Sequence, residues 1–219
     1  MTLATAGQPL ASPQFKPAFQ QTLLSKTPRS STGLRTSISW SDPGEPNGKP
    51  KAVKSFVLKF HPGTVFDTSA LVACKASDSK VQRAGLRACP ARSKLGGGST
   101  EAIAGAGIAF KTVVTFFNAR GHIIVLVQVN GRTLTNFRDE VKNGTIFVNA
   151  QIPAGISLTK LDLTIPPHSR KVRKKRRVYA RTPATCPASG SWTTTATFTY
   201  VDGSEQELTS DSPCASGRA

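Results

Sequence analysis

The chain has 219 residues, 38% of them hydrophobic, which is enough to build the core of one large domain or two small ones. Its 29 Lys and Arg against 12 Asp and Glu leave a net charge of +17, which is typical of proteins that contact polyanions. The composition argues against a wholly disordered chain. The strictly apolar runs are far shorter than the roughly 20 residues that a membrane helix needs.

The N-terminal segment, residues 1–34, is rich in Pro, Gln, Ser and Thr, and we predict that it is extended, partly flexible or an edge strand. Ala4-Thr5-Ala6 has the small-x-small form of a signal-peptidase site, but no full signal peptide precedes it. We therefore expect a signal peptide that is truncated or absent in this chain; the alternative is an ordinary frayed N-terminus. The first strands are predicted at residues 35–40 and 53–60, on either side of a Pro- and Gly-rich loop.

Residues 67–89 are the best candidate for helix, with Asp78 or Ser79 capping a short turn. A run of three glycines, Gly96 to Gly98, follows. It does not fit a phosphate-binding loop, because the lysine of such a loop comes after the glycines and Lys94 comes before them. We predict a flexible turn at this position.

The rest of the chain is a series of short predicted strands. A pair at residues 112–117 and 122–129 flanks a turn, and the second strand is apolar on both faces, which predicts a central place in the sheet. Further strands are predicted at residues 145–150, 158–165, 178–182, 192–200 and 206–209. In total we expect about nine short strands and one short helical turn. The predicted fold is all-β, an antiparallel β-sandwich of immunoglobulin-like or jelly-roll-like type, with one domain over residues 35–214 and a disordered tail at 215–219.

The chain has four cysteines, Cys74, Cys89, Cys186 and Cys214. Their even number and separate placement predict two disulfides and no metal site, since none of them forms a C-x-x-C pair. Their order favours Cys74–Cys89 and Cys186–Cys214, one of three possible connectivities. A hairpin turn at Asp202-Gly203 would support the second pair by placing residue 214 opposite residue 191. Disulfides indicate an extracellular or cell-envelope protein; the alternative is four buried thiols in the cytosol.

One short segment carries nearly half of the net charge. Its eight cations, with no acidic residue among them, are Arg170, Lys171, Arg173, Lys174, Lys175, Arg176, Arg177 and Arg181. The segment lies between two predicted strands, so we expect a hairpin tip or a long loop. Such a cluster attracts nucleic acid, anionic wall polymer or lipid headgroups through its summed field and through counterion release. The alternative is a solvated loop that keeps the protein soluble, and base stacking has weak support because only Tyr179 lies near the cations.

Other candidate sites are weaker. Asp139 and Glu140 are adjacent, and on a strand they would point to opposite faces, so they cannot act together on one substrate; we predict a solvated loop. The strand face of Trp192, Phe198 and Tyr200 is predicted to be core, with an aromatic sugar-binding platform as the alternative. We expect no catalytic centre, no metal and no cofactor.

The segments around the cysteines are distinctive as a set. They are residues 60–68, 74–78, 88–90, 93–98, 186–192, 196–203 and 212–214. Together they resemble a family of uncharacterised secreted proteins from actinobacteria, the high-GC Gram-positive bacteria. The resemblance covers roughly residues 36–214 and implies an exported, all-β, disulfide-bonded protein. It brings no activity, cofactor or catalytic residue.

These observations predict a non-enzymatic, exported structural or binding protein, associated with the cell envelope or an extracellular assembly, whose basic loop contacts an anionic polymer. The alternative is a nucleic-acid-binding structural protein with a basic arm, similar to a viral coat protein. An enzyme acting on wall polymer or carbohydrate would need a pair of acids that the sequence does not show.

Overall fold

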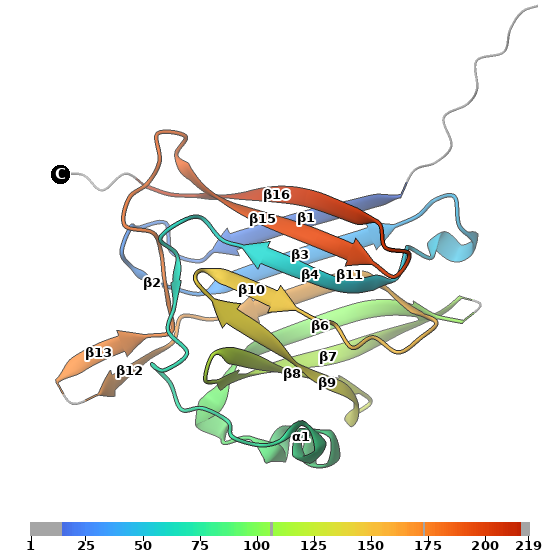
Figure 1. The fold of residues 1–219 in the computed structure, drawn as a ribbon, viewed down its shortest axis with the longest axis horizontal. Helices are drawn as coiled ribbons and strands as arrows, with labels where there is room; N and C mark the ends of the chain where they lie inside the picture. The colour runs from blue at the N-terminus through green and yellow to red at the C-terminus, as the bar shows by residue number, and fades with distance from the viewer. Residues whose placement is uncertain (1–14, 106, 173, 216–219) are drawn as a thin grey trace, which may run out of the picture.

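The computed structural model of the protein describes residues 15–105, 107–172 and 174–215, and antiparallel strands dominate it (Figure 1). Eleven of the strands form one sheet. Their order across the sheet is β1 (Lys16–Leu23), β3 (Leu34–Ser41), β11 (Ile156–Ile165), β6 (Lys94–Ala104), β7 (Ile108–Ala119), β8 (His122–Val129), β9 (Arg132–Lys142), β10 (Thr145–Val148), β4 (Val53–Lys59), β15 (Ser191–Tyr200) and β16 (Glu205–Pro213).

Smaller elements lie at one end and on one side of this sheet. A three-stranded sheet contains β2 (Ser31–Thr32), β14 (Ala180–Arg181) and β5 (Val65–Phe66), and a separate hairpin pairs β12 (Ser169–Val172) with β13 (Lys175–Val178). The helical elements are α1 (Asp78–Ala84), η1 (Pro46–Gly48), η2 (Gly85–Ala88) and η3 (Ala91–Ser93).

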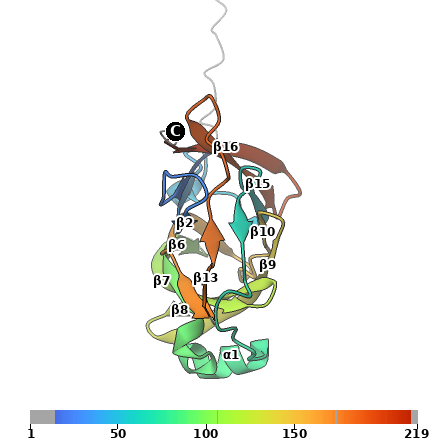
Figure 2. The same cartoon turned by 90° about the vertical axis from the view of Figure 1, so that its left-hand side faces the viewer.

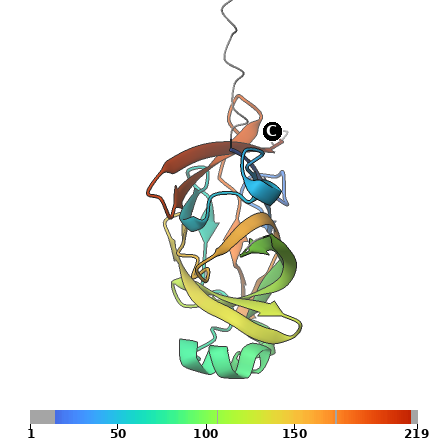
Figure 3. The ribbon, with the colours of Figure 1, turned by 90° about the vertical axis from the view of Figure 1, so that its right-hand side faces the viewer.

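The large sheet curls until its two edge strands meet, which gives a nearly closed barrel (Figures 2 and 3). Serine hydroxyls join the edges. The Gln21 N–H donates to Ser210 Oγ at 2.8 Å, the Leu23 N–H donates to Ser212 Oγ at 3.0 Å, and Ser212 Oγ donates to the Gln21 carbonyl at 2.9 Å. These contacts satisfy backbone groups of β1 that an open edge strand would leave unpaired.

The all-β prediction is confirmed, but the predicted architecture needs correction. The described residues form 16 strands where about nine were expected. A sandwich is not confirmed, because the eleven-stranded sheet runs unbroken from β1 to β16 and its edges meet. The N-terminal segment of residues 1–34 contributes the edge strand β1 and the short strand β2 to the fold. Ala4-Thr5-Ala6 and most of the predicted tail lie outside the described residues.

The glycine run is not a turn. Gly96, Gly97 and Gly98 lie inside β6, between β11 and β7. A Cβ at Gly97 would collide with the Val114 carbonyl oxygen, and a Cβ at Gly98 would collide with the Asp162 carbonyl oxygen. Glycine is needed here because neighbouring backbones approach too closely for a side chain, which is a reason to find glycine in a strand interior.

The last hairpin differs by one residue from the predicted register. Ser191 pairs with Pro213, not with residue 214. The turn has three residues, because the Tyr200 N–H donates to the Ser204 carbonyl, and Gly203 takes the left-handed conformation with φ 81° that such a loop requires.

Two hydrophobic layers explain the central position of β8, which is confirmed. Ile123 and Val125 belong to the cluster that fills the barrel, whereas Ile124 and Leu126 pack in a second cluster on the outer face. The second cluster includes Val81 of α1, together with Cys74 and Cys89 from the segments beside that helix. Figure 1 shows α1 lying below β7 and β8. The helix begins after Ser77, whose hydroxyl accepts the Lys80 N–H, so neither Asp78 nor Ser79 is the cap.

Two disulfides are present, Cys74–Cys89 and Cys186–Cys214, the pairs that the order of the cysteines favours. The first holds the segment around α1 against the outer face of the barrel, and the second links the start of β15 to the end of β16. Both close loops whose freedom in the unfolded chain is thereby reduced. Disulfides of this kind indicate an oxidising environment.

Candidate functional site

The basic segment forms a hairpin that stands away from the barrel, at the left of Figure 1. We call β12, β13 and the turn between them the basic hairpin. In its register Arg170 pairs with Arg177, Lys171 with Arg176, and Val172 with Lys175. Two of these three pairs place cation opposite cation, which destabilises a strand pair. The hairpin therefore carries its charge at a cost to its own stability.

The described cations of the basic hairpin are exposed to solvent, and one of them has an acidic partner. Arg177 Nη2 lies 3.4 Å from Asp67 Oδ2, an ion pair that the sequence did not predict. Arg176 Nε donates to Ser169 Oγ at 2.9 Å. Among the described residues, Arg170, Lys171, Lys174 and Lys175 form no ion pair and are exposed. Arg173 lies outside the described residues.

Arg181, the last cation of the predicted cluster, does not belong to the basic hairpin. Arg181 is exposed in β14, where it pairs with Ser31 and Val65 in the three-stranded sheet. Tyr179 is 1% exposed and packs against the Phe66 ring. It is therefore not available to stack on a base.

A second feature lies inside the barrel. Asp139 was predicted in a solvated loop, and this prediction is wrong: it lies in β9, is 4% exposed, and faces the apolar interior, while Glu140 faces solvent. Asp139 Oδ1 has no hydrogen-bond partner among the described residues. Burial raises the pKa of Asp139 well above its ordinary value of 3.8, because the charged form would lose its hydration.

Two other buried hydroxyls lack partners among the described residues, Tyr179 OH and Thr64 Oγ1. Burial raises the pKa of Tyr179, and the nearby Asp139 carboxyl raises it further. Asp139 and Tyr179 are thus electrostatically close without a hydrogen bond between them. Buried polar groups without a hydrogen-bond partner are rare in folded proteins, where such groups are usually paired.

The raised pKa of Asp139 predicts how stability depends on pH. The folded state binds the proton of Asp139 more tightly than the unfolded state does. The stability that this bound proton contributes is fully present below pH 3.8 and is lost as the pH rises through the raised pKa. In that window the native protein should lose up to about 1.4 kcal/mol per pH unit relative to Asp139→Asn, which has no proton to release. Urea unfolding of both proteins from pH 4 to 8 measures the difference, and parallel curves would contradict the prediction.

Sequence reasoning missed Asp139 for an identifiable reason. Phe137 and Val141 flank it at a spacing of two, which places all three on one face of a strand. That alternation was a usable signal. The adjacent acids and the surrounding polar residues made a loop the more natural interpretation.

Comparison of the chain with protein-family models, with curated proteins and with solved structures finds no match. Within residues 15–105, 107–172 and 174–215, no three His, Cys, Asp or Glu side chains gather as a metal site would require. In the same part of the chain, every helix is too short or too polar to cross a membrane.

Proposed function

We propose that this protein is an exported, non-enzymatic binding protein of the cell envelope or of an extracellular assembly, and that the basic hairpin holds an anionic polymer. The observation that carries the proposal is a projecting hairpin whose exposed cations face one another and are largely unpaired. The two disulfides support the compartment.

The charges of the basic hairpin do little for the fold. Its two valines, Val172 and Val178, are only half-buried, and its cross-strand cation pairs repel each other. A hairpin that costs stability is best explained by a ligand that neutralises it. A polymer that bears regularly spaced phosphates would release its counterions on contact with these cations.

The hairpin offers charge without an aromatic surface. Tyr179, the aromatic residue nearest to the cations in sequence, is buried. Recognition through phosphate groups is therefore favoured over base stacking. An anionic wall polymer such as teichoic acid fits this chemistry and the proposed compartment.

The test replaces the four exposed cations that form no ion pair, Arg170, Lys171, Lys174 and Lys175, by Gln. The matched control replaces Lys80, Arg83, Arg87 and Arg92, which are exposed on and after α1, so both variants lose four charges. We expect the hairpin variant to lose affinity for purified wall teichoic acid about tenfold or more at low salt, with a flatter dependence of log affinity on log salt. Its melting temperature should stay unchanged or rise slightly.

The control separates site from net charge. Equal losses in both variants would show that only the overall charge matters, and unchanged binding by the hairpin variant would show that the hairpin is a solvated bystander. Duplex DNA bound more tightly than teichoic acid, with the same dependence on the hairpin, would replace the proposal by the alternative of a nucleic-acid-binding structural protein.

A further inference from the structure

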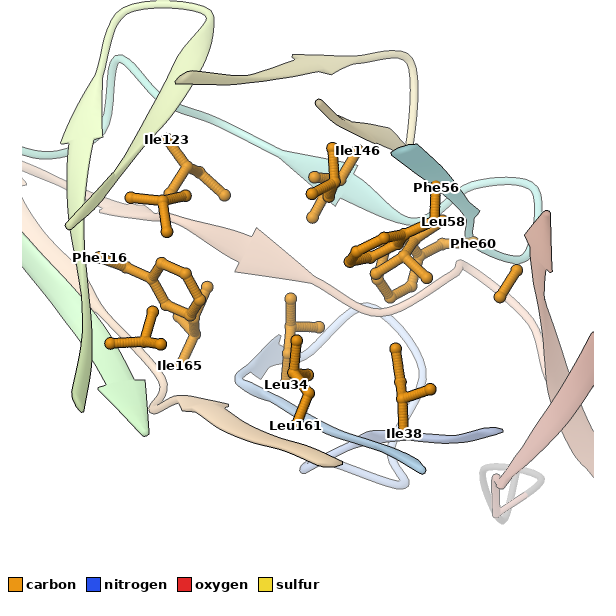
Figure 4. Packing of buried hydrophobic residues seen from close by; sticks show 14 of the residues in the cluster. Leu34, Ile38, Phe56, Leu58, Phe60, Phe116, Ile123, Ile146, Leu161 and Ile165 are labelled. Atoms are coloured by element: carbon orange, nitrogen blue, oxygen red, sulfur yellow. The ribbon is translucent and has the colours of Figure 1, made fainter. Parts of the chain in front are cut away.

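The barrel encloses an apolar cavity that the basic hairpin does not use. Side chains from opposite walls point into the same space, as Figure 4 shows for Phe116, Ile123, Ile146, Leu34 and Ile165. The cavity has a volume of about 120 Å³, and its walls are almost entirely carbon. An engineered apolar cavity of about 150 Å³ stays dry and binds benzene, so this space is of a size that holds a small apolar molecule.

The cavity reaches the end of the barrel opposite the basic hairpin. Its lining there includes the segment between β10 and β11, residues 150–153, together with Phe110 and Leu134. Gln151 and Pro153 of that segment are exposed, and Leu134 is 36% exposed. Exposed residues therefore border the cavity at this end of the barrel, where a ligand would enter without opening the sheet.

Asp139 supplies the ionisable group of this largely apolar wall. It lines the cavity and is 4% exposed, and its Oδ1 has no hydrogen-bond partner among the described residues. An ionised carboxylate in such surroundings is very costly, so the neutral acid is the favoured form, and a neutral acid can donate one O–H. An apolar site with one well-placed polar group is the usual make-up of a small-molecule pocket.

We propose that the barrel interior is a binding site for a small neutral apolar molecule that carries one carbonyl oxygen, and that Asp139 donates a hydrogen bond to that oxygen. The walls select an apolar body of about six carbon atoms, because the cavity is somewhat smaller than one that binds benzene. The Asp139 hydroxyl selects the oxygen, because a ligand without an acceptor leaves the buried acid unpaired. The site is separate from the basic hairpin and does not rest on the function proposed for it.

Calorimetric titration with two ligands of the same carbon skeleton tests the proposal. Cyclohexanone carries a carbonyl oxygen and cyclohexane has none. We expect the native protein to bind both, with cyclohexanone about tenfold tighter, the ratio that a hydrogen bond worth about 1.4 kcal/mol gives. Asp139→Leu should abolish this preference and still bind cyclohexane, and Asp139→Asn, whose amide also donates, should restore the preference.

A second pair of variants tests the place of binding. Ala102 lines the cavity and is 2% exposed, so Ala102→Phe should fill the space and remove binding of both ligands. Val113 is 59% exposed on the outer face of β7, and Val113→Phe should leave both affinities unchanged. No binding by the folded native protein would overturn the proposal, as would a preference for cyclohexanone that survives in Asp139→Leu. If Ala102→Phe fails to fold, the ligand preferences of the Asp139 variants still test the proposal.

Discussion

Replacing Ile124 by Asp is expected to cost more than about 4 kcal/mol of the free energy of unfolding, or to prevent folding. Ile124 is 0% exposed and packs in the layer between the barrel and α1. That layer includes Val81 and the Cys74–Cys89 disulfide. The cation opposite Ile124 in register is Arg138 of β9, which is already engaged by Asp78 and the Ala76 carbonyl. A new carboxylate would have to take Arg138 from these partners or be buried unpaired. Guanidinium unfolding with the disulfides intact measures the loss.

The matched control is Val113→Asp on the adjacent strand β7. Val113 is 59% exposed, so its carboxylate stays in water and the cost should be about 1 kcal/mol, the size of a strand-propensity effect. Similar losses in the two variants would show that the layer beneath α1 is hydrated, and that β8 is not buried on both faces in solution.

A single methyl group at Gly98 should cost about 3 kcal/mol. The backbone at Gly98 is not in the left-handed region, so Gly98→Ala meets no conformational penalty there. The cost is steric: the new Cβ would collide with the Asp162 carbonyl oxygen on β11, and backbone cannot move aside as a flexible side chain can. Strands β6 and β11 would have to separate at the point where Asp162 pairs with Ser99.

Gly203→Ala separates the steric from the conformational effect. Gly203 has φ 81° with nothing near a new Cβ, so alanine there meets only the left-handed backbone penalty of about 1 kcal/mol. Chemical unfolding of both variants should place Gly98→Ala well below Gly203→Ala in stability. The reverse order would mean that β6 shifts freely against β11 and that the glycine run is not needed for close packing.

Local patterns in the sequence were sufficient for much of the fold. The apolar run at residues 122–129 predicted a strand buried on both faces, because a strand exposed on one face alternates with polar residues. The turn at Asn130-Gly131 between β8 and β9, where both residues have positive φ, is also a local feature, because Asn-Gly favours two-residue hairpin turns. The charge cluster predicted an exposed hairpin tip or long loop, because so many cations cannot be buried without partners.

The glycine run, the buried acid and the closure of the barrel were decided by contacts distant in sequence. Gly98 meets the backbone of Asp162, and its three-glycine run looks like a flexible turn until β11 lies beside it. Asp139 faces inward because the pleat of β9 is fixed by Phe137 and Val141, and the cost of its burial is visible only once the opposite wall is in place.

The sequence by itself therefore determined the all-β class, the turn at Asn130-Gly131 and the exposure of the basic segment, all of which depend on neighbours a few residues apart. The barrel depends on the twist accumulated over eleven strands, which no local pattern encodes. At the seam, the backbone of Gln21 bonds the hydroxyls of Ser210 and Ser212, about 190 positions away. In the sequence these two residues look like ordinary surface serines. Only when the twisted sheet brings its edges together do these hydroxyls acquire partners, and only then do the cavity and its buried acid exist.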